Sequence, residues 1–271
     1  SGINDNLQFG NNSQSMLLEK AHNSNYELNL YQLDNFYTSL FVKNLVVKSE
    51  IKNIIKDNEL PIVSGLTLWL KADSVEIING KVATWYDISG NNYHLTQNIE
   101  SKRPTQTIST LNNLPVLSFD GNDFLRVDFP SPYPQPCTVF VIWKTNSAYM
   151  QTLIDNLAYP NHFLDNWKGL GIRLYALSEV SYWKSNPFDF ILTTGVYNFT
   201  NSKLYENDIL KKTGDVGTES VHGFCIGYRS AFNDRYFNGS VAEIIFYNRA
   251  LDSAEIKQVN YYLKEKYRMT F

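Results

Sequence analysis

The chain has 271 residues, a formal net charge of -3 and an aromatic content of 14%, led by 18 tyrosines and 16 phenylalanines. This length can bury one sizeable core with a smaller extra element. The net charge argues against a nucleic-acid footprint, which requires clustered Lys and Arg, and no apolar run approaches the length of a membrane span. The aromatic residues favour an all-β class, because they fit half-buried sheets.

Residues 1–60 differ from the rest of the chain in polarity and in the spacing of their apolar residues. Residues 1–25 are polar and lack periodicity, whereas residues 30–54 carry eight positions at alternating spacings of three and four, all apolar except Asn44. Such a seam is typical of a coiled coil, in which one Asn commonly fixes the register. We expect an N-terminal, partly helical extension over 1–60 that joins two or three copies through residues 30–54. A lone packed helix, or a strand at "LFVKNLVV", remains the alternative.

The chain opens on Ser1-Gly2 instead of Met. We therefore expect it to be a piece of a longer protein, with a leader, an anchor or further domains before residue 1.

The cysteines and histidines form no recognisable ligand set. Cys137 and Cys225 both lie in apolar, strand-like segments, and we interpret them as small buried hydrophobic residues, with a disulfide as the alternative. Neither belongs to a Cys-x-x-Cys pair, and the four histidines are scattered, so the sequence predicts no zinc site.

Beyond the N-terminal extension, short extended segments alternate with turns. Residues 81–97 and 114–129 each read as a strand, a polar turn and a second strand. The proline-rich stretch 130–136 is expected to be a connection, because proline cannot sit in a central strand. Residues 137–145 are strongly β and predicted to be central. Further segments of this kind follow at 170–177, 190–198, 202–214 and 224–230, and this spacing predicts a sandwich or barrel.

Near the C-terminus, residues 240–248 read as a strand that covers a core. Side-chain alternation places Ala242, Ile244 and Phe246 on one wholly apolar face. Glu243 and Tyr247 lie on the other face, which is the more polar one.

A short amphipathic helix is predicted to follow this strand. Asp252 precedes Glu255 by three residues, the pattern of a reciprocal N-cap. The apolar stripe of the helix is formed by Ile256, Val259, Leu263 and Tyr267.

The segments "GLTLWLKADS", "VATWYDISGNNYHLTQ", "LPVLSFDGNDFL", "TVFVIWK" and "FNGSVAEIIFYNRALDSAEI", in this order, resemble a known family. It is the laminin-G-like or concanavalin A-like lectin and glucanase domain, in its bacterial and phage branch. The likeness covers about residues 62–271. It implies an antiparallel two-sheet jelly-roll sandwich over 61–271, closed by a short C-terminal helix.

The candidate carbohydrate-binding residues are Trp167, Tyr182 and Trp183. Flat aromatic rings stack on sugar rings, and these three lie in "LDNWKG" and "VSYWKSN", where polar turn residues predict exposure. They fall in the predicted rim loops 155–170 and 178–190. The alternative for each is a core position, which we favour for Trp143.

Two acidic turns offer candidate ligand sites. Asp87 and Trp85 are interpreted as structural, with the carboxylate bonded to the amides of the "SGNN" turn. Asp120 and Asp123 in "DGND" place several oxygens on one turn, and members of the resembled family often bind calcium, which requires six to eight oxygen ligands. The alternative is ordinary Asp-Gly hairpin chemistry, and no other cofactor is expected.

The sequence lacks the catalytic strand motif E-x-D-x-x-E of laminarinase-type members of the family, whose carboxylates act as acid and nucleophile. We therefore expect no enzyme. If the chain does act on polysaccharide, Glu206, Asp208 and Glu243 are the first carboxylates to test.

Together these features predict a non-catalytic binding or adhesion module on an extracellular or virion surface, such as a phage tail fibre. Its expected partner is a surface glycan or another host-surface receptor, held through rim loops and strengthened by multivalency. A purely structural fibre or capsid-decoration domain is the first alternative, and a polysaccharide-acting enzyme is the second.

Overall fold

The structure, a computed structural model, describes residues 59–157, 163–167, 171–184 and 188–271. These residues belong to one compact unit, Asn58–Phe271. The predicted stalk at residues 30–54, and all but the last two residues of the predicted extension 1–60, lie outside the described residues. Within the described part, no helix is both long enough and apolar enough to cross a bilayer.

The described residues are mostly β, with one α-helix near the C-terminus. The strands are β1 (Leu66–Ile78), β2 (Lys81–Asp87), β3 (Leu95–Thr96), β4 (Thr105–Ile108), β5 (Pro115–Asp120), β6 (Leu125–Tyr133), β7 (Cys137–Thr145), β8 (Gln151–Asp155), β9 (Leu164–Trp167), β10 (Gly171–Tyr175), β11 (Glu179–Trp183), β12 (Ile191–Tyr197), β13 (Ser202–Glu206), β14 (Ile209–Gly214), β15 (Val221–Ile226) and β16 (Asn238–Tyr247). The helices are the 3-10 turns η2 (Glu100–Lys102) and η3 (Phe199–Asn201) and the α-helix α3 (Ser253–Tyr267).

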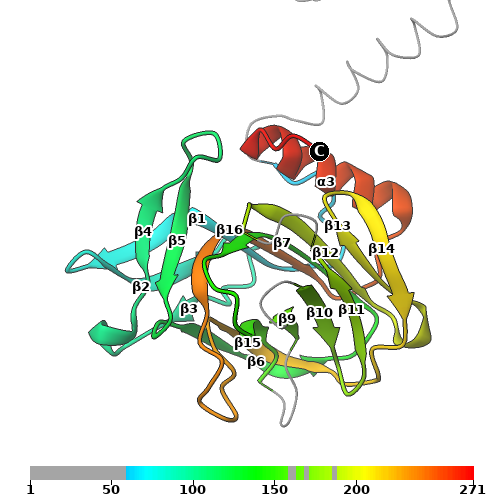
Figure 1. Ribbon diagram of the computed structural model, residues 1–271, viewed down its shortest axis with the longest axis horizontal. Coiled ribbons are helices and arrows are strands. Elements are labelled where there is room, and N and C mark those ends of the chain that lie inside the picture. Colours follow the sequence, from blue (N-terminus) through cyan, green and yellow to red (C-terminus); the bar gives the residue numbers. More distant parts are fainter. Residues whose placement is uncertain (1–58, 158–162, 168–170, 185–187) are drawn as a thin grey trace, which may run out of the picture. The chain divides into compact units, whose positions relative to one another are not determined.

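The strands form one hydrogen-bonded sheet that wraps around a core (Figure 1). Its order is β11-β10-β9-β8-β15-β6-β3-β2-β1-β16-β7-β12-β13-β14, and β5 adds to β16 with β4 beside it. Every pairing between these strands is antiparallel. β11 at one end of this order contacts β13 and β14 at the other end, which makes the sheet a sandwich that is nearly closed into a barrel.

Two apolar cores stabilise this arrangement. The first lies inside the wrapped sheet and contains Trp85 and Trp143, both fully buried. The second lies between the outer face of β1, β7, β12 and β16 and the helix α3, which Figure 1 shows packed along the sheet. β16 contributes to both cores, so it is buried on both faces.

This double burial changes the expected alternation in β16. A register shift lies between Val241 and Glu243 in the pairing with β7, as in a β-bulge. As a result, Val241 joins Ile244 and Phe246 in the first core, whereas Ala242 and Tyr247 join the second. The face predicted to be polar is therefore covered by α3.

The predicted helix and its N-cap are confirmed. The Asp252 side chain accepts from the backbone N–H groups of Ala254 and Glu255, and the Glu255 side chain accepts from the N–H of Asp252. The four residues of the predicted stripe are at most 2% exposed, because they face the second core.

The interpretation of the proline-rich stretch 130–136 as a connection holds for residues 134–136, which join β6 to β7, and is wrong for residues 130–133. β6 continues to Tyr133. In its pairing with β15, Asp128 pairs with Gly223 and Tyr133 pairs with Val221, and a register shift lies between these two pairs. Pro130 and Pro132 fall within this irregularity, where the ladder does not require the N–H groups that proline lacks.

The cysteines and the "SGNN" turn follow the expectation. Cys137 and Cys225 are buried and free. Asp87 accepts from the backbone N–H groups of Trp69, Ser89 and Tyr93.

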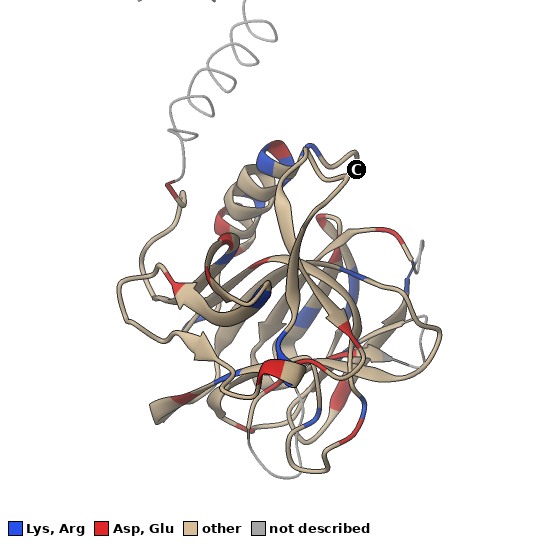
Figure 2. Ribbon diagram, turned by 90° about the vertical axis from the view of Figure 1, so that its left-hand side faces the viewer, with Lys and Arg blue, Asp and Glu red and all other residues tan. Residues whose placement is uncertain are grey.

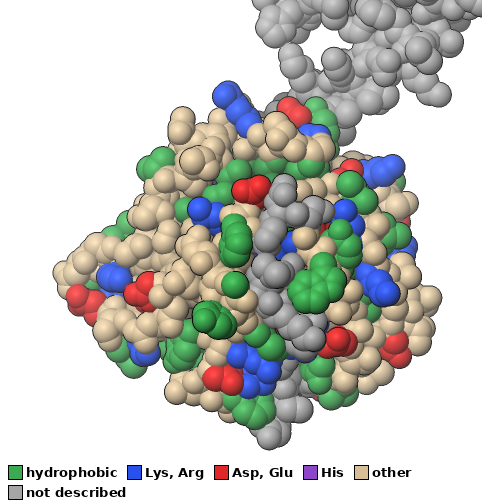
Figure 3. Space-filling view, in the orientation of Figure 1, with side chains coloured by type: hydrophobic (Ala, Val, Ile, Leu, Met, Phe, Trp, Pro, Cys, Tyr) green, Lys and Arg blue, Asp and Glu red, His purple; other side chains and the backbone are tan. Residues whose placement is uncertain are grey.

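Charged residues are spread over the described strands and helix. Figure 2 shows acidic and basic residues interspersed on the side that it presents. Figure 3 likewise shows hydrophobic side chains scattered among charged ones on the face seen in Figure 1.

Candidate functional site

Two of the aromatic residues predicted to bind sugar lie in one row across three adjacent strands. Gly171 of β10 pairs with Trp167 of β9 on one side and with Trp183 of β11 on the other. Directly paired residues share a face of the sheet. The Trp183 side chain is 55% exposed, which makes its ring accessible to a ligand. We refer to Trp167, Gly171 and Trp183 as the aromatic row.

Tyr182 lies on the opposite face, because side chains alternate along a strand. It pairs with Ile172 and packs against the first core. The Nζ atom of Lys211 lies 5.2 Å from the centre of its ring. The structure thus places Trp167 and Trp183 in one row and Tyr182 apart from them.

A guanidinium group is fixed on the same face as the aromatic row, two residues further along β10. Arg173 donates to Asp165 of β9 over 2.9 Å and to Glu179 over 3.1 Å. Its Cζ atom lies 5.1 Å from the centre of the Tyr175 ring. Charge-assisted hydrogen bonds of this kind hold polar groups in a defined geometry, which suits directional recognition.

The inner side of the same end of the sheet contains a buried polar cluster. The Nζ atom of Lys184 donates to Oδ1 of Asn166 over 3.0 Å and lies 4.7 Å from the centre of the Trp143 ring. Burial lowers the pKa of Lys184 to about 8, and the negative charge of Glu206 opposes this shift. Buried groups with shifted pKa values are concentrated at functional sites, although structural networks contain them too.

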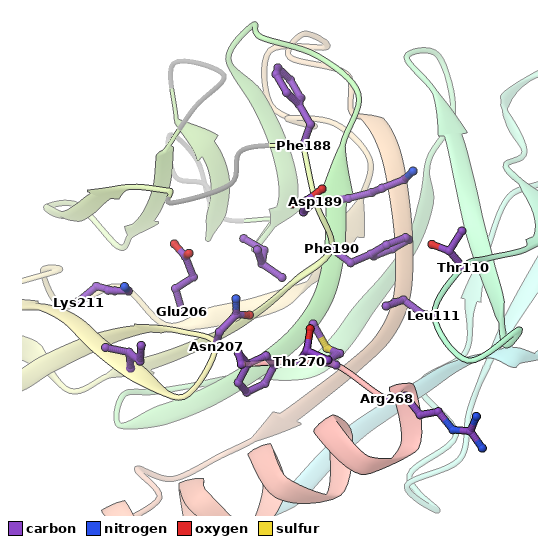
Figure 4. Close-up of a pocket in the computed structure, with 15 residues that line it drawn as sticks. Thr110, Leu111, Phe188, Asp189, Phe190, Glu206, Asn207, Lys211, Arg268 and Thr270 are labelled. Atoms are coloured by element: carbon purple, nitrogen blue, oxygen red, sulfur yellow. The ribbon is translucent and has the colours of Figure 1, made fainter.

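A hollow of about 460 Å³ adjoins this cluster (Figure 4). Glu206, Asn207 and Lys211 of the β13–β14 hairpin line one side of it, and Phe188 and Phe190 line another. Glu206 is only 2% exposed. The remaining lining residues are Thr110, Leu111, Lys144, Asp189, Ile191, Ile209, Arg268, Met269, Thr270 and Phe271.

The three carboxylates named for an enzymatic function do not share one site. Glu206 lines the hollow, whereas Asp208 accepts a hydrogen bond from the side chain of Asn260 on α3. Glu243 faces α3 and accepts from Trp69 Nε1 over 2.6 Å. These bonds give Asp208 and Glu243 structural roles.

The turn with Asp120 and Asp123 has the contacts of a hairpin. Asp123 Oδ2 accepts from the N–H of Asp120, and Asp120 Oδ1 accepts from the N–H of Asn122. Burial raises the pKa of Asp123 to about 6. Among the described residues, no group of three or more His, Cys, Asp or Glu is placed to hold a metal ion. Calcium at this turn stays a prediction.

Sequence analysis did not identify Asn166, Arg173 or Lys184 as site residues. They come from different strands, and no short-range pattern predicts that such residues meet. The only local signal is that polar residues flank the tryptophans in "DNWK" and "YWKS".

No family model matches the chain, and no curated protein matches its sequence.

Solved structures with a similar fold include carbohydrate-active and receptor-binding proteins. One of them is domain 4 of AbnA, an extracellular GH43 arabinanase from Geobacillus stearothermophilus, in complex with arabinotriose. This domain has a TM-score of 0.52 and 17% identity to the chain, and the match covers 73% of this chain and 98% of that domain. Trypanosoma rangeli sialidase in complex with sialic acid has a TM-score of 0.52 and 13% identity over 83% of this chain. The binding domain of Paraclostridial Mosquitocidal Protein 1 has a TM-score of 0.53 and 13% identity over 72% of this chain.

At these identities the likeness shows the fold alone. The chain spans 38% of the length of the sialidase and 52% of the length of the mosquitocidal binding domain. The shared feature is therefore the β-sandwich fold.

Proposed function

We propose that this chain is a non-catalytic binding module that recognises a surface glycan through the aromatic row. The observation that carries the proposal is the register of Trp167 and Trp183 on either side of Gly171, with the Trp183 side chain 55% exposed. An exposed indole presents a flat apolar face and an N–H donor, a combination that is enriched at interfaces.

The strand register fixes the backbone spacing of the row. Adjacent strands lie about 4.8 Å apart, so the Cα atoms of Trp167 and Trp183 are separated by about 10 Å, with a glycine between them. Gly171 itself is buried, so the accessible part of the row is the exposed ring of Trp183.

The hydroxyl groups of a sugar also require directional partners. Glu179 lies on the same face of the sheet as the aromatic row, and its side chain is 41% exposed; the Arg173 side chain, only 6% exposed, donates to it from behind the accessible surface. Apolar contact combined with a few oriented polar groups is the usual composition of a small-ligand site. This pairing favours a polar ligand with one flat apolar face, which is the chemistry of a pyranose.

The structural neighbours support a binding role without deciding it. They include a domain in complex with arabinotriose and a toxin binding domain, and they also include a sialidase. We further propose that residues 61–271 form a two-sheet jelly roll of the laminin-G-like class, displayed on an extracellular or virion surface. Oligomerisation through residues 30–54 would raise weak single-site binding by multivalency.

The test is a glycan array probed with the labelled full chain, its Trp183→Ala variant and its Tyr86→Ala variant. Tyr86 is the matched control, because it is an exposed aromatic residue on β2, far from the row in sheet order. We expect binding to a defined glycan class that Trp183→Ala abolishes and Tyr86→Ala retains.

Two results would contradict the proposal. Absence of binding to every glycan would favour the structural fibre or capsid-decoration role. Release of new reducing ends from a bound polysaccharide, lost on Glu206→Gln, would instead show an enzyme.

A further inference from the structure

Three reactive side chains are buried at one point inside the sandwich. Asn166 on β9 is fully buried, Lys184 directly after β11 is 8% exposed, and Glu206 at the end of β13 is 2% exposed. Burying a lysine is costly unless its amine finds a partner or loses its charge. Here the amine of Lys184 lies beside the side-chain carbonyl of Asn166.

The geometry brings the amine close to the amide carbon. Lys184 Nζ lies 3.0 Å from Asn166 Oδ1, and the carbonyl carbon is one C=O bond, about 1.23 Å, from that oxygen. The ring of Trp143 lies 4.7 Å from Nζ and limits where the amine can move. Two groups confined in this way react with a high effective concentration.

The amide itself is held in a fixed orientation. The Asn166 side-chain nitrogen donates to Thr145 Oγ1 over 3.2 Å, to the Ser147 carbonyl over 3.3 Å and to the Tyr149 carbonyl over 3.2 Å. These acceptors surround the nitrogen and leave the oxygen for Lys184. The carbonyl therefore faces the amine.

The protonation state also favours reaction. Only a neutral amine is a nucleophile, and burial lowers the pKa of Lys184 to about 8, so a fraction of the amine is neutral at neutral pH. Glu206 pairs with Thr193, whose Oγ1 accepts from Nε1 of Trp143, so Glu206 lies on the sheet face where the Trp143 ring contacts Lys184, and its charge acts on Lys184. A buried carboxylate in this position can accept and return a proton.

We infer that Lys184 and Asn166 form an intramolecular amide cross-link, with Glu206 as the carboxylate that transfers the proton. The lone pair of Nζ attacks the side-chain carbonyl carbon of Asn166, and a new C–N bond forms. The bond between that carbon and the Asn166 amide nitrogen breaks. Glu206 moves one proton from Nζ to the departing nitrogen, which leaves as ammonia. No oxidant or other reactant is required.

The cross-link would tie β9 to the end of β11, on either side of β10. These are the strands that carry the aromatic row, so the bond would fix the spacing of its two tryptophan positions. The inference rests on Lys184, Asn166 and Glu206 alone and holds whether or not the row binds sugar.

Mass spectrometry of the folded full chain tests this inference. After incubation at pH 9, where more of the amine is neutral, we expect an intact mass lower than the sequence mass by one ammonia, about 17 Da. Proteolysis should give a branched peptide that joins Lys184 to Asn166. An intact mass equal to the sequence mass in the folded protein would overturn the inference.

Two variants separate this reaction from others. Succinimide formation at an Asn also releases ammonia, but it requires no lysine. Lys184→Arg should therefore keep the full mass, and a loss of ammonia that persists in this variant would contradict the cross-link. Glu206→Gln should keep the full mass while circular dichroism shows an unchanged fold, and cross-linking at the wild-type rate would refute the role of Glu206.

Discussion

Buried polar groups occur in two regions of this molecule, and they differ in their surroundings. Between the sheet and α3, Glu243 accepts from Trp69 Nε1 and from Tyr267 Oη over 2.8 Å, and Lys266 pairs with it. At the β9–β11 end, the buried cluster adjoins a hollow and an exposed tryptophan. Burial of polar groups therefore does not mark a site by itself. The adjoining hollow and the exposed ring distinguish the second region.

The largest expected effect concerns the helix-covered region. Glu243→Ala removes the acceptor shared by Trp69 Nε1, Tyr267 Oη and Lys266, and it leaves a largely buried ammonium without its partner. Breaking a buried pair in this way typically costs about 3–5 kcal/mol. We expect the free energy of unfolding in urea to fall by that amount. Glu76→Ala, which removes an exposed carboxylate, is the control, and an equal loss in both variants would contradict a structural role for Glu243.

The next largest expected effect is a pH dependence of the free energy of unfolding that arises from Asp155. Asp155 is fully buried, its Oδ2 accepts from the Ser230 backbone, and its Oδ1 has no partner among the described residues. Burial raises the pKa of Asp155 from 3.8 to about 6. The folded state therefore binds the proton of Asp155 more tightly than the unfolded state does. The contribution of this proton to the free energy of unfolding is complete below pH 4 and is lost as the pH rises toward 6.

Asp155→Asn should remove that loss. We compare the free energy of unfolding of the variant with that of wild type at each pH. This difference should favour the variant by on the order of 2–3 kcal/mol more at pH 8 than at pH 4. Urea unfolding at both pH values gives the two differences. Asp128→Asn, at an exposed carboxylate on β6, serves as the control. A difference for Asp155→Asn that does not change with pH would refute the assigned pKa shift.

A smaller effect is expected at the N-cap of α3. Asp252→Ala removes the acceptor of the Ala254 and Glu255 N–H groups. Loss of an N-cap costs about 1 kcal/mol. Thermal unfolding followed by circular dichroism should show the decrease, and Ser253→Ala should not. Equal stability of Asp252→Ala and wild type would mean that packing against the second core alone holds the helix start.

The smallest effect on stability belongs to the aromatic row. Trp183→Ala removes a ring that is 55% exposed. Surface substitutions away from buried networks usually change stability by less than about 0.5 kcal/mol. We therefore expect unchanged urea unfolding together with the loss of glycan binding. A loss of several kcal/mol would assign Trp183 to structure instead of recognition.

Features that depend on neighbouring residues in the chain were predictable from the sequence. The N-cap of Asp252 and Glu255 and the apolar stripe of α3 follow from spacings of three and four residues, and both are present. The structural role of Asp87 followed from its turn. Each of these depends on contacts within a few residues or on helical periodicity.

Features that depend on distant partners were not predictable. The bulge beside Glu243 lies in a strand that is paired on both sides and covered on both faces, so its position depends on partners distant in sequence. The prolines of β6 are tolerated because its pairing with β15 is interrupted there. The meeting of Lys184 with Asn166 depends on the register of three strands, which side-chain patterns alone do not fix.

The most direct test of the central claim is a two-dimensional proton–nitrogen NMR titration that follows the indole N–H signals. The chain has five tryptophans, and Trp85 and Trp143 are fully buried internal controls. When the glycan identified on the array is added, we predict that the Trp183 signal shifts and saturates while the Trp85 and Trp143 signals stay in place. Saturable binding that leaves the Trp183 signal unmoved would contradict the aromatic row as the recognition site.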